Sequence, residues 1–314
     1  MAKEKLSVII PCYYSEKSLR QVVDEVVTVI EADSRYDYEV ILINDGSTDG
    51  TWKVIQELCG DNAKIKGINL SKNYGQHSAL MAGFRAVSGD IVVGLDDDGE
   101  HNPAEMFKLI DKLKEGYDYV AADYGKGKKS SLFRNMGTAV NERMARSLVG
   151  LPKEAVVSSF FVERRFVADQ IAQCTNTFPY IIGLLLQATD KLGNVKLQRR
   201  ERLYGRSGYN FRKLLALWVN GFTAFSVKPL RIATILGFLV SFAGFAFGIY
   251  LIINKLFHPE VQLGWSSIMS TILFVGGAIM LLLGMLGEYI GRIYININNN
   301  PQYVVRERVN LEND

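Results

Sequence analysis

The chain has 314 residues, of which 48% are hydrophobic, and its formal net charge is +3 at pH 7. This length and apolar content suffice for a full hydrophobic core and for more than one structural unit. The nearly balanced charge gives no reason to expect a nucleic-acid partner. The cysteines Cys12, Cys59 and Cys174 lack the spacing of metal ligands and are typical of ordinary thiols in a reducing compartment.

Apolar, β-branched runs alternate with helical patterns through the N-terminal part of the chain. Strands are expected at 6–10, 39–43, 65–70, 90–95 and 117–122, and helices at 15–31, 51–58, 77–87 and 103–114. This alternation predicts an α/β fold with a doubly wound, mostly parallel sheet. The glycine-rich dinucleotide fingerprint and the P-loop motif are both missing, so neither a dinucleotide-binding protein nor a P-loop NTPase is supported.

The loop 44–50 follows the second expected strand. Its small residues would let a ligand approach the backbone, and two carboxylates, Asp45 and Asp49, could accept hydrogen bonds from a ribose or a base. The alternative is an N-capping turn for the next helix, with Ser47, Thr48 or Asp49 as the cap. The two roles are compatible.

An acidic segment, 94–103, follows the fourth expected strand and contains Asp96, Asp97, Asp98 and Glu100. In open α/β sheets, ligands bind at the carboxyl ends of the strands. Carboxylates this close repel one another unless a cation lies between them, and a hard divalent ion shared with phosphate oxygens would satisfy them. A solvated acidic turn before a helix is the alternative, and the segment alone leaves it open.

Basic residues are concentrated in the second half of the soluble part. In order, the chain shows a basic glycine- and serine-rich segment at 125–134, a helical pattern at 134–148, a β-branched and aromatic run at 155–162, a strand-like run at 195–203 and a flexible basic turn at 204–209. The arginines around this turn are suited to binding a phosphate. A solvated basic face is the commoner fate of such a run.

Two apolar stretches, 232–253 and 268–286, are long enough to cross ~30 Å of hydrocarbon, and the second extends towards 293. Basic residues flank the pair on its outer sides, whereas the connecting loop has a single lysine. The positive-inside rule therefore predicts that both termini are cytoplasmic. The predicted organisation is a catalytic domain at 1–210, interfacial amphipathic helices at 211–229, two transmembrane helices within 230–293 joined by an external loop at 254–267, and a cytoplasmic tail at 294–314.

Six short motifs occur in a characteristic order, at 8–13, 44–51, 73–76, 96–103, 202–207 and 287–294. With them the whole chain resembles the inverting family 2 glycosyltransferases with a GT-A fold, of the polyisoprenyl-phosphate kind. Dolichyl-phosphate mannose synthases and bacterial undecaprenyl-phosphate sugar transferases belong to that group. The resemblance implies a Mg²⁺- or Mn²⁺-dependent enzyme that moves one sugar from a UDP- or GDP-sugar to a polyprenyl phosphate. It also implies a multi-pass protein of the bacterial inner membrane, and the amphipathic helices before the anchor suggest a homo-oligomer.

The resemblance also implies roles for individual residues. Nucleotide contacts are expected at Pro11, Tyr13, Glu16, Asp45, Asp96 and Asp97, metal contacts at Asp96, Asp98 and Glu100, and acceptor-phosphate contacts at Arg134, Arg202 and Ser207. Together with Asp96 and Asp98, the last three form the expected catalytic set.

The chain departs from the family pattern at several places. The usual asparagine and first glutamate after the starting tyrosine are Tyr14 and Ser15, and a leucine–glutamine pair is replaced by Gly99 and Glu100. Many relatives carry an acidic residue, sometimes regarded as the base, where this chain has 157–160. A phosphate monoester is already ionised near neutral pH and hardly needs a base, so a subgroup difference is expected, as in the aminoarabinose-transferring branch.

The motif of processive synthases is absent, which favours transfer of a single sugar. Two alternatives stay open: transfer to another lipid such as a diacylglycerol, and a non-catalytic membrane scaffold or sugar-flipping component. His77 and His101 are interpreted as hydrogen-bonded structural histidines and are left out of the expected site.

Overall fold

The structure is a computed structural model that describes residues 3–125, 151–152, 155–177, 179–200, 228–257, 264–297 and 300–311. The chain forms two compact units, one made of Met1–Asn210 with Asn299–Asp314 and the other of Phe211–Asn298. The predicted helix at 134–148, the basic turn, the interfacial helices and the residues Arg134, Arg202 and Ser207 lie outside the described residues.

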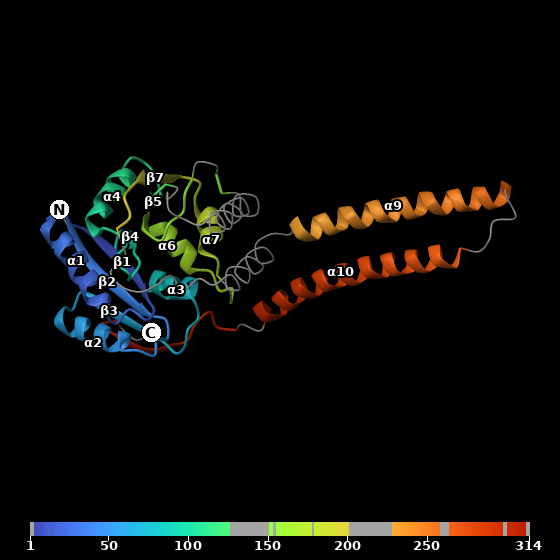
Figure 1. Cartoon of the computed structure of the whole chain (residues 1–314). Helices are drawn as coiled ribbons and strands as arrows, with labels where there is room; N and C mark the ends of the chain where they lie inside the picture. Colours follow the sequence, from blue (N-terminus) through green and yellow to red (C-terminus); the bar gives the residue numbers. More distant parts are fainter. Residues whose placement is uncertain are drawn as a thin grey trace. The chain divides into compact units, whose positions relative to one another are not determined.

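The first unit is built on an eight-stranded sheet with the order β7-β5-β6-β4-β1-β2-β3-β8 (Figure 1). Its strands are β1 (Glu4–Cys12), β2 (Tyr36–Asn44), β3 (Ile65–Leu70), β4 (Ile91–Gly94), β5 (Tyr119–Asp123), β6 (Phe161–Arg164), β7 (Leu192–Lys196) and β8 (Val305–Val309). Strand β1 runs parallel to β2 and β4, β2 to β3, and β5 to β7. Strand β6 is antiparallel to β4 and β5, and β8 to β3. The prediction of a mostly parallel α/β sheet is confirmed.

Helices cover both faces of this sheet. One face packs against α1 (Leu19–Ala32), α2 (Thr51–Asp61) and α4 (Met106–Lys114), which follows the short 3-10 helix η1 (Pro103–Glu105). The other face packs against α3 (Gln76–Ala86), α6 (Arg165–Ala172) and α7 (Ile181–Ala188). Because the central strands are buried on both faces, they appear in the sequence as continuous apolar runs rather than alternating ones.

The elements predicted before residue 123 all appear, with shifted ends. The first helix begins at Leu19 instead of residue 15, because 15–18 form a turn in which the Ser18 and Leu19 amides donate to the Ser15 carbonyl. In the run 155–162 only the end is a strand, β6, and of the described residues 195–200 the first two are the end of β7. Helices α6 and α7 were not predicted.

The segment after the second apolar stretch corrects the prediction of a tail at 294–314. Helix α10 (Trp265–Ile297) continues into that range, and β8 then pairs with the edge strand β3. Strand β8, with the sequence Val-Arg-Glu-Arg-Val, carries charged residues where a solvent-facing edge strand requires them. Its short polar sequence explains why it was missed.

The second unit contains α9 (Lys228–Phe257) and α10. Within its described residues, one stretch, Phe274–Gly291 in α10, is long and apolar enough to cross a membrane, and a shorter apolar stretch, Gly237–Tyr250, lies in α9. The second spanning helix therefore stays a prediction.

Candidate active site

Three predicted motifs meet at the carboxyl ends of neighbouring parallel strands. The Asp45 amide after β2 donates to the Cys12 carbonyl at the end of β1, at 3.0 Å. The Tyr13 amide, just beyond β1, donates to the Asp97 carboxylate beyond β4, also at 3.0 Å. The structure thus brings the start motif, the 44–50 loop and the acidic segment to one edge of the sheet, as expected for a ligand site in an open α/β fold.

Three side chains surround the Asp96 carboxylate of the acidic segment. Its Oδ1 accepts from Gln76 Nε2 at 3.2 Å, while Oδ2 accepts from the Ser159 hydroxyl and lies 3.1 Å from His101 Nε2. Burial raises the pKa of Asp96, but the hydrogen bonds from His101 and Ser159 outweigh burial and leave the pKa below its ordinary value. Asp96 is therefore held in its charged form.

His101 is a buried connector between Asp96 and an aromatic pair. Its ring stacks on Phe160 and on Tyr124, with centroids 5.2 and 5.7 Å away, and Nδ1 lies 2.6 Å from the Tyr124 hydroxyl. In the neutral tautomer that donates from Nε2 to Asp96, Nδ1 accepts from Tyr124. His101 is hydrogen-bonded, as predicted for a structural histidine, but one of its partners, Asp96, is a predicted site residue.

Asp97 and Asp98 have different surroundings. Burial, and beyond it the negative charges of Asp96 and Asp98, raise the pKa of Asp97 to about 6 against the opposing hydrogen bond from the Tyr13 amide. The Asp97 carbonyl also accepts from the Ser18 hydroxyl at 2.8 Å, so this residue ties the acidic segment to the start of α1. Asp98 is partly exposed and accepts from its neighbouring Glu100 amide at 3.0 Å.

The metal set Asp96, Asp98 and Glu100 stays a prediction. Within the described residues, no three histidine, cysteine, aspartate or glutamate side chains converge in a way that could hold a metal ion. The Glu100 carboxylate forms an ion pair with Arg199 at 3.1 Å. Asp96 and Asp98 still offer the hard oxygen donors that Mg²⁺ and Mn²⁺ prefer, so the residues fit an ion that takes its other ligands from a bound phosphate.

Asp45 is buried and organises a neighbouring loop. Its carboxylate accepts from the amides of Tyr74 and Gly75 at 2.7 and 2.9 Å, and burial raises its pKa against these two bonds. Gly46 has φ +65°, and a Cβ there would lie 2.2 Å from the backbone of Lys72. Only glycine allows the two loops to pack this closely.

The remaining predicted nucleotide residues surround the end of β1. Pro11 lies inside β1, and the Tyr13 side chain is 49% exposed, with its ring edge-to-face against Tyr14. Glu16 accepts from the amide of Gly50, the residue that caps α2. The alternative of a capping turn is borne out in part: Gly50 occupies the cap position, but the Asp49 carboxylate accepts from the amide of Thr51, the first residue of α2, at 3.2 Å. The Ser47 and Thr48 hydroxyls bond Tyr14 instead.

Three contacts of Asp96 were missed as site features. His101 was set aside, Gln76 belonged to a recognised motif without a role, and Ser159 lies in the segment 157–160 that was noted only for lacking an acidic residue. A polar pair within an otherwise apolar run before β6 was the available signal for Ser159.

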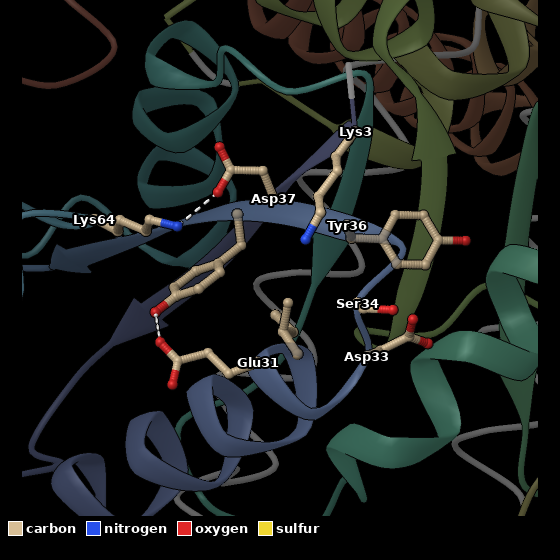
Figure 2. A pocket seen from close by; sticks show the side chains of 9 residues that line it. Lys3, Glu31, Asp33, Ser34, Tyr36, Asp37 and Lys64 are labelled. Carbon is tan, nitrogen blue, oxygen red and sulfur yellow. Dashed lines mark hydrogen bonds and ion pairs between the residues drawn. The ribbon is translucent and has the colours of Figure 1, made fainter. Parts of the chain in front are cut away.

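A pocket of about 530 Å³ lies at the opposite, amino end of the sheet and contains none of the predicted residues (Figure 2). Two interactions join residues that line it: Lys64 bonds Asp37 at 2.6 Å, and the Tyr38 hydroxyl bonds Glu31 at 2.6 Å. The candidate active site is therefore the carboxyl edge of the sheet rather than this pocket.

Comparisons with known proteins agree with the motifs. A family model described as glycosyl transferase family 2 matches residues 7–172, and one described as GtrB C-terminal hairpin matches residues 228–293. The chain is 31% identical over 307 residues to a Bacillus subtilis (strain 168) protein called uncharacterized glycosyltransferase YkcC, covering 98% of this chain and 95% of that protein.

Solved structures of one enzyme are also similar. Glucosyl-3-phosphoglycerate synthase from Mycobacterium tuberculosis in complex with UDP matches with a TM-score of 0.51 and 20% identity, over 71% of this chain and 79% of that chain. The same enzyme with Mn²⁺, UDP and glucosyl-3-phosphoglycerate matches with a TM-score of 0.48 and 22% identity, over 70% and 78%. At this level of identity the likeness is one of fold.

Proposed function

This chain belongs to glycosyl transferase family 2, and from that premise we propose that it transfers one sugar from a nucleotide-sugar donor to a polyprenyl phosphate. Its sheet-containing unit has the mostly parallel α/β arrangement of the GT-A fold. The match of residues 228–293 to the GtrB C-terminal hairpin supports a lipid-linked acceptor. The observation that carries the proposal is the meeting of the start motif with the acidic segment, through the bond from the Tyr13 amide to Asp97.

In this proposal the donor is a UDP- or GDP-sugar that binds where β1, β2 and β4 end. The half-exposed Tyr13 ring offers an aromatic face to the base, and Pro11, Glu16 and Asp45 border the same region. The nucleoside diphosphate then lies beside Asp96 and Asp98. The neighbouring Asp97 supports this region through the Tyr13 backbone.

Asp96 and Asp98, together with oxygens of the donor diphosphate, would hold Mg²⁺ or Mn²⁺. When bound, such an ion neutralises charge on the leaving nucleoside diphosphate. The chain's own contribution is to keep Asp96 charged and fixed in direction, through His101, Ser159 and Gln76.

The acceptor half of the proposal rests on Arg134, Arg202 and Ser207, which would bind the lipid phosphate. An ionised phosphate oxygen forms a bond to the anomeric carbon while the bond from that carbon to the diphosphate oxygen breaks, and attack from the opposite face inverts the configuration. No general base is required because the attacking oxygen carries no proton.

We further propose that α9 and α10 form a two-helix membrane anchor. Basic residues in the first turn of α9 and after the apolar part of α10, among them Lys228, Arg231 and Arg292, favour a cytoplasmic position for the catalytic unit at a bacterial inner membrane. The assembly would be a homo-oligomer.

The test is a transfer assay with the full-length protein in detergent, undecaprenyl phosphate, Mg²⁺ or Mn²⁺, and a panel of labelled UDP- and GDP-sugars. Mass analysis of the lipids should show one new glycosyl-phosphoryl-polyprenol that disappears with EDTA. A product formed on diacylglycerol instead would contradict the assignment of polyprenyl phosphate as the acceptor. Absence of metal-dependent nucleotide binding would contradict the proposal that the chain is an active glycosyltransferase.

A further inference from the structure

Residues 300–311, here called the C-terminal segment, return from α10 to the sheet of the first unit. Strand β8 pairs with β3 over Gly67–Val309, Ile68–Arg308, Asn69–Glu307 and Leu70–Val305, with an irregularity between Asn69 and Leu70. Just beyond β3, the Ser71 amide donates to the Val304 carbonyl at 2.8 Å. The backbone of the segment is therefore bound to the strand that leads into the site.

A buried glutamine fixes the start of this segment. Gln302 is 6% exposed, and its Nε2 donates to the carbonyls of Cys174 and Asn176 at 2.8 and 2.7 Å. Its Oε1 accepts from Arg85 on α3 at 3.0 Å, and Arg85 also bonds the Tyr303 hydroxyl at 3.0 Å. Every polar atom of the Gln302 amide thus has a partner, which makes a specific and costly-to-break anchor.

The segment reaches the candidate site through the loop 71–75, here called the β3–α3 loop. Arg306 donates to the Ser71 carbonyl at 3.2 Å, and the Ser71 hydroxyl lies 2.9 Å from the Tyr74 hydroxyl. The amides of Tyr74 and Gly75 then bond Asp45. The next residue, Gln76, bonds Asp96.

The β3–α3 loop supports both Asp45 and Asp96. The β3–α3 loop lies between two supports, the C-terminal segment on one side and the glycine-rich loop at Gly46 on the other. Asp45 lies after β2 and Asp96 after β4, and each accepts a bond from the end of this loop or from the residue that follows it. A displacement of the loop would alter both carboxylates at once.

We infer that the C-terminal segment is a positioning element of the donor half of the site, acting through the β3–α3 loop on Asp45 and Asp96. The enzymatic part of this inference rests on the proposed function, whereas the structural part does not. Residues that follow the apolar hairpin in the chain thereby help to set the geometry of carboxylates that precede it.

Hydrogen exchange of the full-length protein in detergent tests the structural part. The variant is Arg306→Ala, and the matched control is Glu307→Ala, the adjacent residue of β8, whose carboxylate bonds Trp52 and Gln56 on α2. Arg306→Ala should speed exchange of the peptide 71–76 by roughly fivefold to tenfold, the effect of losing one hydrogen bond of ordinary strength at an exposed position. Glu307→Ala should instead affect α2, and Arg306→Lys should restore most of the protection.

Gln302→Leu removes the buried anchor and should give a larger increase in the same peptide. Exchange of 71–76 that is no faster in Arg306→Ala than in Glu307→Ala would overturn the inference, whatever happens to Gln302→Leu. In the transfer assay, Arg306→Ala should raise the KM for the donor about threefold to tenfold with little change in kcat. A wild-type protein that transfers no sugar would refute the proposed function and leave the exchange comparison intact.

Discussion

Near the amino end of the sheet Glu39 lies between two lysines, whereas at the carboxyl end Asp96 and Asp97 are held by amides, hydroxyls and a histidine. Lys66 and Lys5 lie 2.7 and 2.9 Å from the Glu39 carboxylate. In the described part of the chain, neither Asp96 nor Asp97 forms an ion pair with a lysine or arginine. The chain cancels its own charge in the first region and retains negative charge in the second.

The pKa values follow this difference. Burial opposes ionisation of Glu39, but hydrogen bonds from Lys66, Ser7, Lys5 and Ser88 outweigh burial and lower the pKa of Glu39 to about 2. Burial and neighbouring aspartates raise the pKa of Asp97 to about 6. A neutralised carboxylate stabilises the fold, whereas crowded carboxylates cost stability unless a cation binds, so the second region is the one arranged for a ligand.

Asp98→Ala has the largest expected effect. Transfer should fall by about 10³-fold because the proposed metal ligand is lost, while the melting temperature shifts by less than roughly 2 °C. The measurement is the transfer assay beside a thermal melt. Full activity of this variant with the metal chelated would refute its role.

Glu39→Gln should destabilise the cluster of Glu39 with Lys5 and Lys66 near the amino end of the sheet. Loss of the carboxylate leaves two partly buried lysines without their partner, so the free energy of unfolding should fall by about 3 kcal/mol. Glu57→Gln, which removes an exposed pair with Arg20, is the matched control and should change stability little. Denaturant unfolding measures the stability of both variants. If Glu39→Gln loses no more free energy of unfolding than Glu57→Gln, the Glu39 cluster does not stabilise the fold.

His101→Gln tests whether His101 supports Asp96 at the carboxyl end of the sheet. The glutamine side chain would keep bulk but lose the ring that connects Asp96 to Tyr124, so half-saturation should need about tenfold more Mg²⁺ or Mn²⁺. The readout is activity against metal concentration. An unchanged metal dependence with a lower melting temperature would leave His101 a purely structural residue.

Acid should affect the Glu39 cluster in a defined pH range. The folded pKa of Glu39 is about 2, below the unfolded value of 4.5, so its contribution is complete above 4.5 and is lost as pH falls towards 2. Between pH 7 and 3.5 the wild type should lose roughly 1 kcal/mol more stability than Glu39→Gln. If the wild type and Glu39→Gln lose the same free energy of unfolding between these two pH values, the pKa assigned to Glu39 is contradicted.

Local patterns predicted most of the catalytic unit. Strands β1 to β5 are apolar runs bounded by turns, and the acidic segment follows a strand, so their positions could be derived from the order of residues alone. Strand β8 could not, because its partner β3 is far away in the chain and its own sequence is mostly charged. Gln302 likewise gave no signal, since its partners lie far from it in the chain.

The site was predicted as a set of residue types rather than as a network. The three aspartates were correctly placed at the carboxyl edge, but spacing does not reveal that Asp97 faces the Tyr13 backbone or that Glu100 pairs with Arg199. Those assignments depend on side-chain direction after a turn. They became visible only with the coordinates of neighbouring strands.

The most direct test of the retained negative charge is calorimetric titration of the full-length protein with UDP and GDP, with Mn²⁺ and then with EDTA. We predict that one nucleotide binds in the presence of metal, that EDTA abolishes binding, and that Asp98→Asn behaves like the EDTA sample. Nucleotide binding of equal affinity in EDTA, or no binding under either condition, would contradict a cation-dependent donor site at this edge of the sheet.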